Sequence, residues 1–238
     1  MPHADFTYHN RTGRRPGRTI RALSAVLPRV ARVWDQVEPY ADAWQAHNLT
    51  ALDQPGPRWF TLGDSLSQGV GASAYDRGWV GQARALVARQ GHTLTVINLS
   101  ATGARVNDVI DDQVPLLATL KPTADDVITV MVGSNDLFGG RPARSSLPSA
   151  YAEMLEHVPP RTIVSTLTQP TRVTAAANTH VERAARAGAI EMVDLRVTGP
   201  SSWRGMLASD VFHPNDDGYA AIATAFVPHL LARLTQGT

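Results

Sequence analysis

A serine, an aspartate and a histidine in this sequence have the types and spacing of a nucleophile and its activating relay. Ser65 lies in the segment GDSLS (residues 63–67), directly behind a short hydrophobic run, and the segment DVFHP occupies residues 210–214. A serine hydroxyl is a poor nucleophile until a neighbouring base accepts its proton, and histidine suits this task near neutral pH. One tight turn would bring the Asp210 carboxylate to Nδ1 of His213, where it orients the imidazole and stabilises its cation. The pattern predicts attack by Ser65 on an acyl carbon.

The segments that must position these residues alternate between strand and helix. Short apolar runs rich in β-branched residues predict strands at 59–62, 94–99, 127–132, 162–167 and 190–195. Helical patterns lie at 80–89, 106–120, 149–157, 174–187 and 216–234. The last of these has one apolar stripe, formed by Tyr219, Ile222, Phe226 and Leu230. Such alternation predicts a parallel sheet with helices on both faces, joined by right-handed crossovers.

Four blocks of polar or small residues follow the predicted strands. Ser65 follows the first strand, Gly103 the second, and the segment with Asn135 the third, while Asp210 and His213 precede the last helix. Ligands of doubly wound sheets bind at the carboxyl ends of the strands, so we expect these residues to converge there. N–H donors at that edge would stabilise charge on the attacked carbonyl oxygen.

These four blocks, in this order, resemble those of the SGNH hydrolases of the GDSL family. The resemblance runs from about Arg58 to the C-terminus, and it leaves out the arginine-rich N-terminal segment. It implies an α/β fold: a three-layer α/β/α sandwich with a five-stranded parallel sheet, flavodoxin-like, here with an N-terminal helical extension. It further implies that no metal or organic cofactor is needed.

The resemblance also assigns roles to residues. It implies that Ser65 is the nucleophile and that Asp210 and His213 complete the catalytic triad. The oxyanion hole would be formed by the backbone N–H groups of Ser65 and Gly103 and by the side-chain amide of Asn135.

Each of these residues also has a structural interpretation. A serine after a strand often belongs to a turn, and Asn135 could cap a helix. Asp210 and His213 could bind a metal, but no third ligand is spaced nearby. Asp64 and Asp136 are assigned to hydrogen bonds within their loops. The sequence has no Gly-x-Ser-x-Gly elbow, which argues against the α/β-hydrolase route to the same triad.

The predicted reaction is hydrolysis of a small-molecule carboxylic ester through an acyl-Ser65 intermediate. The alternatives are an acyl-CoA thioesterase or lysophospholipase, a sugar O-acetyl esterase, and a non-catalytic binding protein of the same fold. Apolar residues in the loops beside the blocks hint at an apolar acyl pocket, although each alone is more often a core residue: Leu66, Val70, Leu137, Phe138, Trp203, Met206 and Phe212. Glycines at 69, 71, 139 and 140 would let these loops move. Acyl chain length, leaving group and oligomeric state stay open.

Residues 1–57 differ from the rest of the chain and form an extension to the hydrolase domain at 58–238. Residues 1–17 are polar and predict a disordered arm. From Ile20 to Val37 apolar residues recur at helical spacing with arginines between them, which predicts an amphipathic helix. Its arginines are most simply solvated, and weak contact with an anionic membrane surface is the alternative.

Composition restricts the class of protein further. The chain has 238 residues, 43% hydrophobic and 18% charged, with a net charge of +1, so it suits one sizeable domain with an appendage and gives no reason to expect nucleic acid. It has no cysteine, which excludes disulfides, thiolate metal sites and cysteine nucleophiles. No apolar stretch approaches the roughly 18 residues of a membrane span. Arginines interrupt the one segment resembling an export signal, and we therefore expect a cytoplasmic protein.

Overall fold

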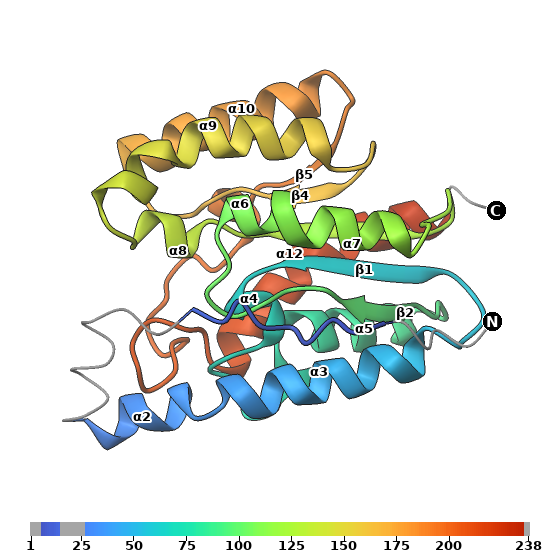
Figure 1. The fold of residues 1–238 in the computed structure, drawn as a ribbon, viewed down its shortest axis with the longest axis horizontal. Helices are drawn as coiled ribbons and strands as arrows, with labels where there is room; N and C mark the ends of the chain where they lie inside the picture. The colour runs from blue at the N-terminus through green and yellow to red at the C-terminus, as the bar shows by residue number, and fades with distance from the viewer. Residues whose placement is uncertain (1–5, 15–26, 236–238) are drawn as a thin grey trace.

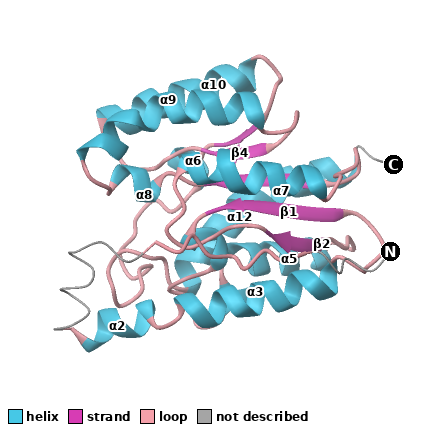
Figure 2. Cartoon of the chain, in the orientation of Figure 1, coloured by secondary structure: helices cyan, strands magenta, loops and turns pink. Residues whose placement is uncertain are grey.

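A computed structural model describes residues 6–14 and 27–235, and its centre is a parallel β-sheet. The strands are β1 (Arg58–Gly63), β2 (Thr95–Asn98), β3 (Val127–Met131), β4 (Ile163–Ser165) and β5 (Glu191–Val193), in the spatial order β2-β1-β3-β4-β5. All four neighbouring pairs are parallel. Helices cover both faces (Figures 1 and 2), which confirms the predicted α/β/α sandwich.

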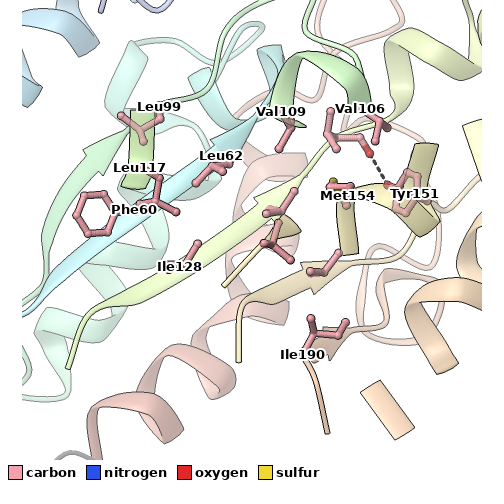
Figure 3. Close-up of a cluster of buried hydrophobic side chains, with 14 of the residues drawn as sticks. Phe60, Leu62, Leu99, Val106, Val109, Leu117, Ile128, Tyr151, Met154 and Ile190 are labelled. Atoms are coloured by element: carbon pink, nitrogen blue, oxygen red, sulfur yellow. Dashed lines mark hydrogen bonds between the residues drawn. The ribbon is translucent and has the colours of Figure 1, made fainter. Parts of the chain in front are cut away.

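Alternate strand residues supply two hydrophobic clusters, one on each face of the sheet, as the pleat requires. Phe60 and Leu62 point into the first cluster, shown in Figure 3. That face is covered by α6 (Val106–Asp108), α7 (Val114–Thr119), α9 (Arg141–His157) and α10 (Arg172–Arg186). The hydroxyl of Tyr151 in α9 donates to the carbonyl of Val132, at 2.6 Å, so even the polar group of this cluster is satisfied.

Trp59 points to the opposite face, into the second cluster. This cluster contains residues of α3 (Val37–Ala51), α5 (Trp79–Arg89) and α12 (Asp216–Thr235). The rings of Trp79 and Phe226 stack with centroids 4.1 Å apart. The predicted apolar stripe of the last helix is fully or almost fully buried here, which confirms it.

The remaining elements are short: α2 (Pro28–Trp34), α4 (Ser65–Gln68), the 3₁₀ turn η1 (Tyr75–Arg77), the π-helical turn η2 (Val109–Gln113), α8 (Ser134–Leu137) and α11 (Leu195–Thr198). The turn η2 interrupts what the sequence predicts as one helix over 106–120. The helix α9 begins at Arg141 and not at the predicted Ser149, because Pro142 starts it at a position where proline is tolerated and Pro148 is accommodated inside it.

The N-terminal extension differs most from expectation. Residues 6–14 do not extend into solvent as the predicted disordered arm would: the Tyr8 hydroxyl donates to the carbonyl of Leu99 and the Asn10 amide donates to that of Asn98. These partners lie about 90 residues away in the sequence, so no local sequence pattern predicts the contacts. Residues 1–5 and 15–17 of the predicted arm, and the first part of the predicted amphipathic helix, lie outside the described residues.

The second part of that helix is present as α2, whose Val30 and Val33 are buried. Helix α3 then packs along β2 and contributes to both clusters, through Ala51 to the first and through Trp44 to the second. Within the described ranges, no helix is both long enough and apolar enough to span a membrane.

Candidate active site

Ser65, His213 and Asp210 form one continuous hydrogen-bonded chain. Ser65 is the first residue of α4, which follows β1 at the carboxyl edge of the sheet, and His213 lies in the loop before α12. The distance from Ser65 Oγ to His213 Nε2 is 3.0 Å, and from His213 Nδ1 to Asp210 Oδ2 it is 2.6 Å. Ser65 and His213 are only 4% and 5% exposed. The structure thus brings together three side chains that the sequence separates by up to 148 positions.

A tight turn sets the geometry of Asp210 and His213. Asp210 Oδ1 accepts hydrogen bonds from the backbone N–H groups of Phe212 and His213, both at 3.0 Å. Val211 adopts a φ of 60°, a left-handed conformation that is uncommon for a β-branched residue and marks local strain. No group of three or more metal-binding side chains occurs in the part of the chain that the structure describes.

The charge of Asp210 is favoured by its partners. Burial opposes ionisation of the carboxyl group, but the hydrogen bonds from His213 and from the backbone outweigh it, so the pKa of Asp210 lies below its usual value. The group is therefore a carboxylate at neutral pH. It can orient the imidazole and stabilise the cation that forms when the ring accepts a proton.

Asp64 caps the short helix that begins with Ser65. Its Oδ1 accepts from the backbone N–H of Leu66 at 2.9 Å, and its Oδ2 lies 3.5 Å from Nδ2 of Asn135. Asp64 is fully buried, and this burial raises its pKa to about 7. Its bonds stay within the loops, as the sequence analysis assigns them.

The two other candidate oxyanion donors lie on the neighbouring loops. Gly103 follows β2 with a left-handed φ of +82°, and Asn135 lies in α8, directly after β3. Asn135 Nδ2 donates to the carbonyl of Ala104, the residue after Gly103, at 3.0 Å. Because the same amide also approaches Asp64 beside the nucleophile, all three loops meet at one point on the edge of the sheet.

Asp136, the neighbour of Asn135, joins α8 to the loop after β2. Its Oδ2 accepts from the backbone N–H of Val106 at 3.1 Å, and burial raises its pKa to about 6. This contact supports the loops and takes no part in the relay, as expected.

Gln113 in η2 holds the start of the loop that carries Ser65, and it is not among the candidates predicted from the sequence. Its Nε2 donates to the carbonyl of Gly63 at 2.8 Å, and its Oε1 accepts from the N–H of the same residue at 2.7 Å. π-Helical turns often occur at functional sites, and here the turn aims a buried amide at the residue two positions before Ser65. Gln113 follows Asp111 and Asp112 in the sequence and resembles one more solvated polar residue of a helix, so no local signal identifies it.

Gly71 is required for the close packing of two loops at the site. It has a φ of +99°, and a Cβ on it would lie 2.7 Å from Cβ of His213 and 2.5 Å from the carbonyl oxygen of Pro214. The turn after α4 therefore presses directly against the loop that carries the candidate base.

A mostly apolar pocket of about 340 Å³ is lined by Leu66, the residue after Ser65, and by Phe212 and Pro214, the two neighbours of His213 in the sequence. Its walls include Leu66, Phe138, Leu167, Trp203, Phe212 and Pro214. Four of the seven predicted pocket residues line it, namely Leu66, Phe138, Trp203 and Phe212, whereas Val70 and Leu137 are core residues and Met206 is not part of the lining. The ring of Phe212 contacts Phe138 and His213 edge-on, with centroids 5.3 and 4.9 Å away, so one wall residue of the pocket contacts the candidate base.

Known proteins share both the fold and the sequence pattern. The family 3 carbohydrate esterase of Clostridium thermocellum aligns with a TM-score of 0.60 and 18% identity, over 76% of this chain and 98% of that one. TesA aligns with a TM-score of 0.58 and 22% identity, over 74% of this chain and 99% of that one. A lipase/acylhydrolase from Enterococcus faecalis aligns with a TM-score of 0.60 and 18% identity, over 75% of this chain and 97% of that one. A comparison with curated protein sequences found no match.

At this identity, the solved structures establish a common fold. The sequence model of the GDSL-like lipase/acylhydrolase family goes further, because it matches residues 61–221, more than half of the chain. The matched region begins within β1 and includes Ser65, Gly103, Asn135, Asp210 and His213. The protein therefore belongs to the GDSL-like lipase/acylhydrolase family of hydrolases.

Proposed function

We propose that the protein hydrolyses carboxylic esters through an acyl-Ser65 intermediate. The observation that carries this proposal is the unbroken chain from Ser65 Oγ through His213 to Asp210, with separations of 3.0 and 2.6 Å. These distances are those of hydrogen bonds able to pass a proton from the hydroxyl to the imidazole. A non-catalytic binding protein has no need of this arrangement.

The reaction then proceeds in two halves. Ser65 Oγ attacks the carbonyl carbon while His213 Nε2 takes its proton; the ester C–O bond breaks, and His213 returns the proton to the departing alcohol. Water next attacks the acyl-enzyme, with His213 again as base, and Ser65 leaves as the carboxylic acid forms. The two products are an alcohol and a carboxylic acid.

Each tetrahedral intermediate places a negative charge on the former carbonyl oxygen. The backbone N–H groups of Ser65 and Gly103 and the amide of Asn135 would donate to it. The support for this role is their position on three adjoining loops, tied to one another through Ala104 and Asp64. Such preorganised donors act mainly in the transition state.

The mostly apolar pocket favours an apolar acyl group longer than acetyl. Its volume is about 340 Å³ and its lining is mostly apolar, which suits a hydrocarbon chain, although Ser134, Ser165, Thr166, Thr168 and Gln169 also line it. Thioesterase, lysophospholipase and sugar O-acetyl esterase activities would use the same triad. They differ in what the pocket accepts, so substrate preference decides among them.

The test is turnover of p-nitrophenyl esters from acetyl to octanoyl, with wild-type protein and Ser65→Ala. We expect wild type to cleave the longer esters with higher kcat/KM than the acetyl ester, and Ser65→Ala to lose all turnover and all labelling by a fluorophosphonate. Ser146→Ala, an exposed position on α9, is the matched control and should behave as wild type. Turnover retained in Ser65→Ala would overturn the mechanism, and a preference for acetyl would overturn the assignment of the acyl group.

A further inference from the structure

The N-terminal arm, residues 6–14, runs alongside the loop that carries Gly103. Arg11 and Thr102 form an isolated parallel bridge, and Arg14 donates to the carbonyl of Gly103 at 3.5 Å. Figure 1 shows the arm in dark blue, passing close to α4. The arm lies outside the region that the family model matches, which begins at residue 61.

Asn10 anchors the arm between the nucleophile helix and the glycine loop. It is fully buried, and its Nδ2 donates to the carbonyls of Asn98 and Ser100 at 2.7 and 2.9 Å. Its own carbonyl accepts from Nε2 of Gln68 at 2.8 Å. Gln68 is the last residue of α4, the helix that starts with Ser65. A polar residue buried with four satisfied contacts, the fourth from Asn48 at 3.3 Å, indicates an integral part of the site.

Two residues away, Thr12 contacts the peptide unit that contains the Gly103 N–H. Its Oγ1 donates to the carbonyl of Thr102 at 2.9 Å. That carbonyl and the N–H of Gly103 belong to the same planar trans peptide and point in opposite directions. Fixing the oxygen on one side therefore fixes the direction of the N–H on the other.

The preceding peptide, between Ala101 and Thr102, is held as well. The backbone N–H of Thr102 donates to Oε1 of Gln68 at 2.9 Å. A Cβ on Gly103 would lie 3.3 Å from Thr12 Oγ1, so the hydroxyl sits directly against the glycine. With Gly103 at a φ of +82°, where glycine is otherwise free to turn, these contacts limit the rotation of its amide.

We propose that Thr12 is a positioning residue that aims the Gly103 N–H at the oxyanion. Its hydrogen bond to the Thr102 carbonyl also polarises the peptide, which strengthens the N–H as a donor. This inference rests on the proposed function, and it makes the N-terminal arm part of the catalytic apparatus.

The test compares Thr12→Val with wild type on an ester that wild type turns over. Valine has the shape of threonine without the hydroxyl, so we expect kcat to fall by about fivefold, the effect of one ordinary hydrogen bond, with KM within twofold. The shape of the pH profile should not change, because the bonds of His213 are untouched. Thr12→Ser keeps the hydroxyl and should restore most of kcat. Thr7→Val is the matched control: Thr7 is exposed on the same arm and should leave kcat unchanged.

The outcomes separate this inference from the proposed function. Wild-type kcat in Thr12→Val, with Ser65→Ala inactive, overturns the role of Thr12 and leaves the esterase mechanism standing. An equal loss in Thr12→Ser, or a loss matched by a lower thermal unfolding temperature, shows that the residue acts on folding and also overturns the role. Activity in Ser65→Ala overturns both proposals. If Thr12→Val does not fold, Thr12→Ala provides the same comparison without the added methyl contact.

Discussion

At the scale of single residues, the side-chain amide of Asn135 makes one hydrogen bond of ordinary length and one long one. Its bond to the Ala104 carbonyl is of ordinary length, 3.0 Å, whereas its contact with Asp64 is long, 3.5 Å. A hydrogen bond of this length is weak, so little free energy is lost when this second N–H donates to another acceptor instead. The side chain is thus oriented by one bond and available through the other.

Asn135→Ala should lower kcat by about a hundred- to a thousandfold, the range found when a single oxyanion donor is removed. The effect should appear in kcat more than in KM, because the charge develops only in the transition state. Steady-state kinetics on one ester measures both constants. Asn107→Ala, on the exposed face of α6, is the matched control and should have wild-type kinetics. A change of less than threefold in Asn135→Ala would remove this residue from the oxyanion hole.

At the scale of elements, the site depends on short turns that close the ends of the strands. The helix α4 has only four residues, from Ser65 to Gln68, and it ends in the left-handed Gly69. Gly71 follows in the same turn and lies in contact distance of the His213 loop. A polypeptide of larger residues could not bring these two loops so close, because any Cβ at position 71 would overlap the backbone opposite.

Gly71→Ala should therefore reduce kcat/KM strongly, by about tenfold or more, since His213 must move away from Ser65 to make room. Gly91→Ala is a stringent control. Its φ of +83° imposes the same kind of backbone strain, but no atom lies within 4 Å of the added Cβ. Both variants should lose some stability in thermal unfolding, and only Gly71→Ala should lose activity. Equal activity in the two would show that the close approach to His213 has no catalytic consequence.

At the scale of the whole molecule, the N-terminal extension is continuous with the hydrolase core. Trp44 of α3 is 2% exposed within the second cluster, and its Nε1 donates to the carbonyl of Gln68 at 3.0 Å. On the other side, Ser209, next to Asp210, donates to the carbonyl of Arg29 in α2 at 2.7 Å. The extension thus contacts both the loop of the nucleophile and the loop of the base.

Trp44→Ala should lower the free energy of unfolding by about 3–5 kcal/mol, the cost of emptying a large buried site. Urea denaturation of the full chain measures this change. Leu49→Ala, on the same helix but 44% exposed, should change it by about 0.5 kcal/mol or less. Similar values for the two variants would mean that the extension is only loosely attached to the hydrolase domain.

Much of the fold could be predicted from the sequence, because its signals are local. Short β-branched runs followed by turn residues gave all five strands, and the blocks at their ends gave Ser65, Gly103 and Asn135 as candidates. Errors arose where a local signal was ambiguous. Pro148 resembles a helix breaker although α9 passes through it, and the helical spacing of the apolar residues in 106–120 does not reveal the turn η2.

The sequence by itself determined the chemistry that is available: a serine, a histidine and an aspartate on an α/β scaffold, with small residues at the strand ends. Only the tertiary structure decided how the amides around them are aimed. Asn10, Thr12 and Gln113 act through bonds to residues 50 to 90 positions away, and no short-range pattern encodes such partners. Their polar side chains are ordinary in sequence, and they acquire a role because folding buries Asn10 and Gln113 fully and Thr12 in part, where a hydrogen-bonding group must find a partner.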